Sequence, residues 1–249
     1  MKYTVLTLFP EITDAFFSNS IMAKAVKWGI IEYQAVNIRD FAFDKHKTCD
    51  DAPYGGGPGM LMLPEPLKKA LDSVQANNGN KRVVYLSPSG RQFNQEMAKE
   101  LAKEQELVLI CGRYEGIDQR VIDSFVDDEI SVGDYVLSSG EVAALTIIDA
   151  TYRLVDSVIC AQSLDEESYS SGLLEYPQFT RPEVFDTMRV PEVLLSGHHE
   201  QIRLWRLEKR VEKTLRQRPD LIEQGKKLGI FDKEIIGIID RLTAGCGQI

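Results

Sequence analysis

Residues 53–60, PYGGGPGM, combine four glycines and two prolines in eight positions. Glycine lets a ligand approach the backbone closely and proline stiffens a loop, so this segment suits a rigid surface against a flat or phosphorylated ligand. A tight surface turn would use the same residue types. This loop alone leaves both interpretations open.

Two further loops offer polar groups beside exposed backbone. They are residues 111–118, CGRYEGID, and residues 131–141, SVGDYVLSSGE. Each supplies one aromatic ring and one carboxylate, namely Tyr114 with Glu115 and Tyr135 with Asp134. Such loops suit an adenosine-like ligand that is held largely by backbone contacts. Three loops of this kind in one chain favour a ligand-binding site.

Short apolar runs before helical segments must position these loops. Strands are predicted at residues 4–9, 82–87 and 106–112, and helices after Pro10 and near 93–103, 119–125 and 141–155. Near-continuous apolar strands separated by helices indicate an α/β fold, with a parallel sheet covered on both faces. Ligands of such sheets bind at the carboxyl ends of the strands, where the loops converge.

Composition and missing motifs exclude several classes of protein. The chain has 249 residues, 43% hydrophobic, and a net charge of −9. It has no apolar stretch of the roughly 18–20 residues that cross a bilayer and no secretory leader, so we expect a cytoplasmic protein without a membrane or DNA partner. A P-loop, GxGxxG, HExxH and GxSxG are all absent, and four widely spaced cysteines predict neither a metal site nor disulfides.

The character of the chain changes after the first two thirds. Residues 1–160 form the predicted α/β domain, residues 161–178 a polar, mobile linker, and residues 179–249 a small all-helical domain. In the last of these, Leu204, Leu207, Val211 and Leu215 recur at helical spacing. Pro219 is expected to end that helix, and residues 233–242 to form another.

A basic segment stands out on this acidic chain. Residues 203–218 contain seven lysines and arginines against Glu208 and Glu212, a net charge of +5 over sixteen residues. Most of these cations fall opposite the leucine stripe. A solvated helix face is the plain interpretation, and a localised anionic partner is the functional one.

Six blocks in one order carry a family resemblance. They are DDAPYGGGPGMLM, YLSPSGR, LICGRYEGIDQRV, VGDYVLSSGE, GLLEYPQFTRPEV and SGHHEQIRLWR. Together they span nearly the whole chain and resemble the bacterial tRNA (guanine-37-N1)-methyltransferase family, TrmD. The resemblance implies a deep trefoil knot of the SPOUT class and S-adenosylmethionine (AdoMet) bound in the knot. It also implies a homodimer with its active site at the subunit interface, a tRNA substrate and a Mg²⁺ requirement without an evident metal-ligand set.

The family's AdoMet pocket maps onto residues of the strand ends and loops. They are Leu86, Ser87, Pro88, Gly112, Tyr114, Glu115, Val132, Gly133, Asp134, Tyr135, Val136, Leu137 and Gly140. The family usually has two glycines before the glutamate of the last loop, and here Ser139 replaces the first.

The family's catalytic residues map onto Arg153 and Glu167. The family has an aspartate as general base five residues before Gly-Leu-Leu, and this chain has Glu167 there, with Asp165 as a competitor in another register. Arg153 also lies four residues after Asp149, a spacing that would suit a purely structural ion pair. Expected tRNA contacts are Gly55, Gly56, Gly57, Glu175, Gln178, Arg181, His198, Arg203, Arg206 and Arg210.

Chemistry explains why such residues are needed. Guanine N1 carries a proton, and its removal during methyl transfer pushes negative charge onto O6. A carboxylate near N1 and an arginine near O6 would serve both needs. A knotted methyltransferase acting on another RNA and a catalytically inactive RNA-binding relative remain the alternatives, the latter because of the glutamate at the base position.

Overall fold

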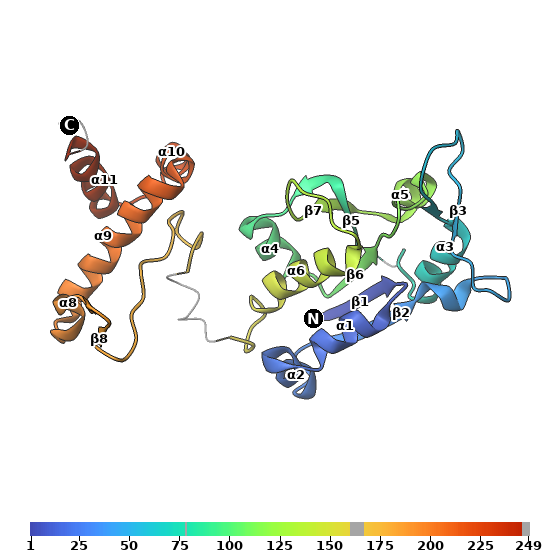
Figure 1. The fold of residues 1–249 in the computed structure, drawn as a ribbon, viewed down its shortest axis with the longest axis horizontal. Helices are drawn as coiled ribbons and strands as arrows, with labels where there is room; N and C mark the ends of the chain where they lie inside the picture. Colours follow the sequence, from blue (N-terminus) through green and yellow to red (C-terminus); the bar gives the residue numbers. More distant parts are fainter. Residues whose placement is uncertain (78, 160–166, 246–249) are drawn as a thin grey trace. The chain divides into compact units, whose positions relative to one another are not determined.

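The computed structural model describes residues 1–77, 79–159 and 167–245 (Figure 1). The chain divides into an N-terminal unit, Met1–Ile159, and a C-terminal unit, Cys160–Ile249. The predicted linker begins at this division, and its residues 161–166, Asp165 among them, lie outside the described residues.

A five-stranded sheet forms the centre of the N-terminal unit (Figure 1). Its strands, in spatial order, are β2 (Glu32–Asn37), β1 (Lys2–Thr7), β6 (Glu106–Cys111), β5 (Lys81–Gln92) and β7 (Asp128–Ser131). Every neighbouring pair is parallel. Because parallel strands end at one edge, the loops after β6 and β7 meet there.

Side chains of the central strand β6 alternate between two hydrophobic cores. Leu107, Leu109 and Cys111 belong to one core, and Val108 and Ile110 to the other. All six residues of β6 are buried, since the strand has neighbours on both edges and helices over both faces. This explains the continuous apolar run in the sequence.

Helices cover both faces of the sheet. Four helices contribute to the core that contains Leu109: α1 (Pro10–Phe17), α2 (Ser20–Lys27), α4 (Gln95–Leu101) and α6 (Gly140–Tyr152). The core on the other face contains residues of the 3₁₀ helix η1 (Ile38–Phe41), α3 (Pro64–Ser73) and α5 (Gln119–Phe125). The predicted α/β fold with helices on both faces is therefore confirmed. The bounds predicted for α5 are those observed, whereas α4 and α6 are shorter than predicted.

Two local features differ from the sequence expectation. The strand predicted at residues 82–87 continues to Gln92 as β5, with an excursion after Leu86, because Leu86 and Arg91 both pair with Ile130 of β7. A two-residue ribbon, β3 (Asp50–Asp51) with β4 (Leu61–Met62), joins the two ends of the loop that contains PYGGGPGM. Strands this short show no alternation from which they could be predicted.

The C-terminal unit packs α9 (His199–Gln217), α10 (Pro219–Leu228) and α11 (Lys233–Gly245) around a core of its own (Figure 1). Val211 is fully buried in this core, whereas Leu204, at the start of the predicted stripe, is 40% exposed. Pro219 follows the end of α9, as predicted. It also occupies the first turn of α10, a helix that the sequence did not predict. Proline is compatible with that position because its missing N–H would have no partner there.

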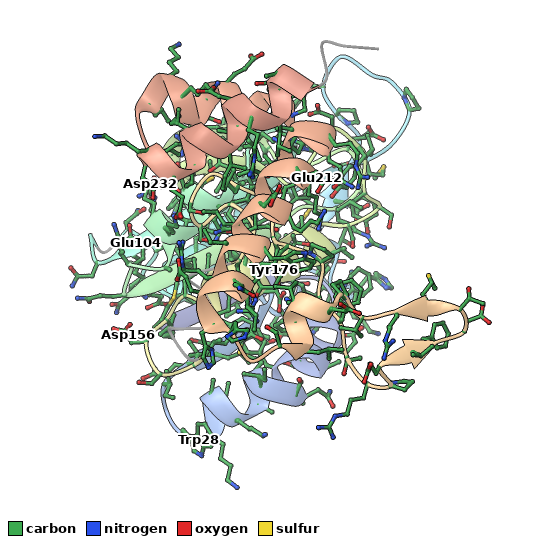
Figure 2. All side chains as sticks on the ribbon, turned by 90° about the vertical axis from the view of Figure 1, so that its left-hand side faces the viewer. Trp28, Glu104, Asp156, Tyr176, Glu212 and Asp232 are labelled. Atoms are coloured by element: carbon green, nitrogen blue, oxygen red, sulfur yellow. The ribbon has the colours of Figure 1, made fainter. Side chains whose placement is uncertain are left out.

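The remaining elements of this unit are short. The helix α8 (Glu192–Leu195) precedes α9, and an exposed hairpin, β8 (Val184–Phe185) with β9 (Met188–Arg189), projects from the helices (Figure 2). The hairpin adds two strands to a domain predicted as all-helical. Among the described helices, none is both long and apolar enough to span a membrane.

Candidate functional site

A cavity of ≈310 Å³ lies where the excursion within β5 meets the loops after β6 and β7. This volume is in the lower range of small-molecule sites, roughly 300–1,000 Å³. The lining residues are Tyr85–Ser89, Gly112–Gly116, Ile130–Gly133, Tyr135–Gly140 and Ala143. Three separate stretches of sequence thus converge on one site, as expected for the carboxyl edge of a parallel sheet.

The cavity gathers the residues predicted to hold the cofactor, with one exception. Asp134 is exposed and does not line it. The structure adds Tyr85, Ser89, Arg113, Gly116, Ile130, Ser131, Ser138, Ser139 and Ala143. Most of these residues are adjacent in the sequence to predicted ones. Extending each predicted stretch by a residue or two would therefore have included them. Ala143 lies in the first turn of α6, the helix that the predicted pocket residue Gly140 begins.

Gly112 and Gly140 bring two of the loops into contact. The Gly140 amide donates to the Gly112 carbonyl over 2.9 Å, and a Cβ on Gly140 would lie 2.6 Å from the Gly112 nitrogen. Any side chain at position 140 would therefore separate the loops. The replacement of glycine by Ser139 does not affect this contact, because it is the second position that needs glycine.

Backbone strain marks the loop that follows β6. Tyr114 lies in the left-handed region with φ of 57°, an uncommon conformation for a residue other than glycine. Such strain often accompanies functional sites. The next residue, Glu115, donates its amide to the Met60 carbonyl over 3.0 Å. The glycine-rich segment 53–60 is thereby joined to the rim of the cavity.

Gly55, Gly56 and Gly57 lie in the exposed part of the same loop. All three have positive φ, and a Cβ on any of them would have no neighbour within 4 Å. The adjacent Tyr54 is fully exposed. Backbone conformation, rather than packing, explains these glycines, whereas Gly59 is restricted by packing against Glu115.

A buried polar cluster lies beside the cavity. Glu141, 1% exposed, accepts a hydrogen bond from Thr7 over 2.5 Å, and its other oxygen lies 4.0 Å from the guanidinium of Arg113. Burial, together with the nearby Glu141 carboxylate, raises the pKa of the Cys111 thiol. Because the thiolate is the reactive form, Cys111 is poorly suited to act as a nucleophile.

Arg153 is the C-cap of α6, whereas Gly140 begins that helix at the cavity. Thirteen residues at 1.5 Å each separate the two by about 20 Å along the axis. An arginine side chain does not bridge that length. Arg153 is accordingly absent from the lining of the cavity in its own chain.

The two predicted carboxylates of the C-terminal unit lie in one compact segment. Glu167 is half-buried, and its carbonyl accepts hydrogen bonds from the Ser170 amide and hydroxyl at 3.2 and 2.7 Å. The Glu175 amide donates to the Ser168 hydroxyl over 3.1 Å, and the Glu175 carboxylate accepts from Gln178. The segment is therefore folded rather than extended.

Helix α9 separates its arginines into different environments. Arg203 is exposed and donates hydrogen bonds to Glu200 and Glu234. The hydrogen bonds to Glu234 contribute most to raising the pKa of the Arg203 guanidinium. The guanidinium of Arg206 lies 4.8 Å from the ring centre of Tyr176, which Figure 2 labels beside α9. Arg210 was expected on the exposed basic face, but it is buried, because it bonds to the segment that contains Leu174.

The other expected tRNA contacts are on the surface. Arg181 and His198 are exposed, and His198 is the N-cap of α9, although its side chain makes no capping hydrogen bond. Across residues 1–77, 79–159 and 167–245, no three His, Cys, Asp or Glu side chains are grouped as a metal site would require.

Comparison with known proteins adds sequence relationships to this geometry. A family model described as tRNA (Guanine-1)-methyltransferase TrmD matches residues 1–224. A Treponema denticola protein named tRNA (guanine-N(1)-)-methyltransferase is 67% identical over 94% of this chain and 96% of its own length. Proteins with the same name from Treponema pallidum (59% identical over 97% of this chain and 96% of that one) and Borrelia duttonii (58%, 94% and 100%) are also similar.

Proposed function

The chain belongs to the tRNA (guanine-1)-methyltransferase TrmD family, and on this premise we propose that it methylates N1 of the guanosine at position 37 of tRNA, with AdoMet as methyl donor. The observation that carries the proposal is the cavity in which three stretches of the chain bring together the residues matching the family's AdoMet pocket. The family resemblance inferred from the six sequence blocks is confirmed by the comparisons.

The residues of the cavity suit AdoMet. Leu86 lies in β5, where the excursion begins, and Gly112 and Leu137 lie in the loops after β6 and β7. Together these stretches offer backbone groups to an adenosine moiety. The close approach at Gly140 leaves no room for side chains where the loops meet, so their backbone atoms can face a ligand. When bound, AdoMet supplies an electrophilic methyl group on a sulfonium. The protein then needs no covalent nucleophile and acts mainly by orienting the two reactants.

Glu167 and Arg153 have complementary roles in the proposed reaction. The Glu167 carboxylate takes the proton from guanine N1 while N1 forms a bond to the methyl carbon and the carbon–sulfur bond breaks. The Arg153 guanidinium, which stays charged, donates hydrogen bonds to O6 as negative charge develops there. The target base must leave its stack to reach these groups.

We place the active site at the interface of a homodimer. Support comes from Arg153, which lies about 20 Å along α6 from the cavity-forming Gly140 of its own chain. An arginine needed for methyl transfer at that cavity must then come from the partner subunit. The trefoil knot implied by the resemblance is part of this proposal.

Four cations of α9, of which Arg203 is exposed and the other three are partly buried, are proposed to neutralise tRNA phosphates. Arg203, Arg206, Lys209 and Lys213 lie on this helix in a chain of net charge −9, so the positive potential is local. Arg210 is buried, so we do not include it among the phosphate contacts. A cytoplasmic location follows from a tRNA substrate.

The resemblance also implies Mg²⁺, for which we assign no ligands. Within the ranges that the structure describes, no group of three potential metal-binding side chains occurs. The described residues therefore do not form a metal cage of their own, and no ligand of the ion is assigned among them.

Transfer of labelled methyl from AdoMet to transcribed tRNA tests the function. We expect methylation of a tRNA with guanosine at position 37 and none when that base is changed to adenosine. Glu167→Gln should lower kcat by about 10²–10⁴-fold, whereas Glu167→Asp should keep more activity. Methylation independent of position 37 would indicate another RNA target. AdoMet binding without methylation of any tRNA would indicate an inactive RNA-binding relative.

A further inference from the structure

Thr214 of α9 holds the segment that follows Glu167. Its side chain is fully buried, and its hydroxyl oxygen accepts a hydrogen bond from the Leu174 amide over 2.9 Å. The same hydroxyl donates to the Arg210 carbonyl one helical turn earlier, over 2.7 Å. Since a hydroxyl has one proton and two lone pairs, both contacts can form together. Leu174 is thereby fixed to the helix by its backbone.

Arg210 makes a second attachment one turn away on the same helix. Its guanidinium donates to the Ser171 hydroxyl over 2.5 Å and to the Leu174 carbonyl over 3.4 Å, and the residue is only 8% exposed. Burying a cation is costly unless it is hydrogen-bonded. An arginine held in this way is committed to the segment and does not extend towards a phosphate in solvent.

Hydrogen bonds within residues 167–175 connect these attachments to Glu167. The Tyr169 amide donates to the Leu173 carbonyl over 2.9 Å, and the Ser170 amide to the Glu167 carbonyl over 3.2 Å. Leu173 is fully buried in the core of the C-terminal unit. A shift at Leu174 would therefore be passed on to the backbone that carries the Glu167 carboxylate.

We propose that Arg210 and Thr214 are positioning residues that set the location of the Glu167 carboxylate through the segment 167–175. The inference rests on the proposed function, in which Glu167 takes the N1 proton. The helix that presents Arg203 and Arg206 to tRNA then also holds the general base. Binding of the tRNA backbone and placement of the base are thus fixed by one rigid element.

Substitutions at Thr214 provide the test. Thr214→Val keeps the shape but loses the hydroxyl, whereas Thr214→Ser keeps the hydroxyl. We expect the valine variant to lower kcat by roughly 10²-fold, as a misplacement of about 1 Å can do, with little change in KM for AdoMet. The serine variant should stay within a few-fold of wild type. Ser171→Ala, which removes one of the two acceptors of Arg210, should also lower kcat.

Thr243→Val in α11 is the control for the loss of a helical threonine hydroxyl. Thr243 also donates back to a carbonyl of its own helix, that of Ile239, over 2.9 Å. It lies outside the segment and outside the proposed binding face. Its valine variant should keep wild-type kcat, and thermal unfolding of all the variants shows whether the fold is retained.

A double-mutant cycle with Glu167→Gln separates positioning from general stability. If Thr214 acts through Glu167, Thr214→Val should cause no further loss in single-turnover rate once Glu167 is glutamine. A Thr214→Val protein with unchanged kcat, or a loss that is equally large in both backgrounds, would overturn the inference. A fully active Glu167→Gln single variant would instead overturn the proposed base itself.

Discussion

Gly59 lies directly against the side chain of Glu115. A Cβ atom on Gly59 would stand 2.7 Å from Cδ of that glutamate, a separation that real Cβ atoms do not reach. The adjoining Met60 carbonyl accepts the Glu115 amide. Glycine at this one position therefore allows a loop some fifty residues earlier in the sequence to support the rim of the cavity.

Gly59→Ala should weaken AdoMet binding, because the Cβ displaces either Glu115 or the loop. We expect a several-fold rise in Kd by titration calorimetry. Gly55→Ala is the control, since Gly55 has φ of 90° against 89° at Gly59 but no neighbour within 4 Å. Both variants should lose about 1–2 kcal/mol of stability from the left-handed backbone. Equal AdoMet affinity in the two proteins would contradict the importance of the contact with Glu115.

Mixed dimers should show whether Arg153 acts across the subunit interface. Arg153→Ala should abolish most activity yet keep AdoMet binding, because this residue is far along α6 from the cavity. Ser139→Trp should block the cavity, which Ser139 lines. Neither variant alone should methylate tRNA.

Mixing the two inactive variants should restore activity if each site combines two subunits. Half of the random dimers are then mixed, and one of their two sites is intact, which gives roughly a quarter of wild-type activity. Light scattering checks that both variants remain dimeric. If the mixture is as inactive as its components, Arg153 serves the cavity of its own chain and the interface proposal fails.

Glu106, at the amino end of β6, should make the stability of the fold depend on pH. Burial alone would raise the pKa of its carboxyl, but hydrogen bonds and ion pairs from Thr4, Lys2 and Lys81 outweigh burial and lower it below its ordinary value of 4.5. A lowered native pKa stabilises the fold above the unfolded pKa. The contribution is lost as pH falls through the native value.

The comparison with Glu106→Gln measures this contribution. The difference in Tm between wild type and the variant should be full above about pH 5 and shrink as pH falls below 4.5. Thermal unfolding at pH 7, 5.5, 4.5 and 3.5 follows it. A difference that stays constant over this range would mean that the charge of Glu106 does not stabilise the fold.

Two helical glycines should respond to alanine in opposite directions. A Cβ on Gly225 of α10 would meet the ring of Phe231, with Cε1 only 2.9 Å away, so Gly225→Ala should destabilise the C-terminal unit by about 1–3 kcal/mol. Gly237 of α11 is exposed, and its Cβ would meet nothing within 4 Å. Gly237→Ala should stabilise by roughly 0.5–1 kcal/mol.

Denaturant unfolding measures both effects in the full chain. Because the two positions share helical backbone, the intrinsic preference for alanine favours both substitutions, and only the contact with Phe231 differs. Stabilisation of both variants would show that the Phe231 ring moves aside without cost.

Local sequence pattern and the motif blocks were sufficient to predict much of the fold and the family of this protein. The apolar run at residues 106–112 predicted the central strand, and the bounds of α5 agree residue for residue. Order and composition of the six blocks identified the family. These features depend on residues close together in the chain, whose periodicity and type the sequence displays directly. The residues mapped onto the AdoMet pocket followed from the same blocks.

Tertiary structure decided which of those residues share an environment. Arg203 and Arg210 belong to one basic run, yet one is exposed and the other is buried against Leu174, because a segment some thirty-six residues earlier packs on that side of α9. Gly55 and Gly59 look alike in one loop, but only Gly59 contacts Glu115. Contacts between distant parts of the chain depend on packing, which local sequence does not encode.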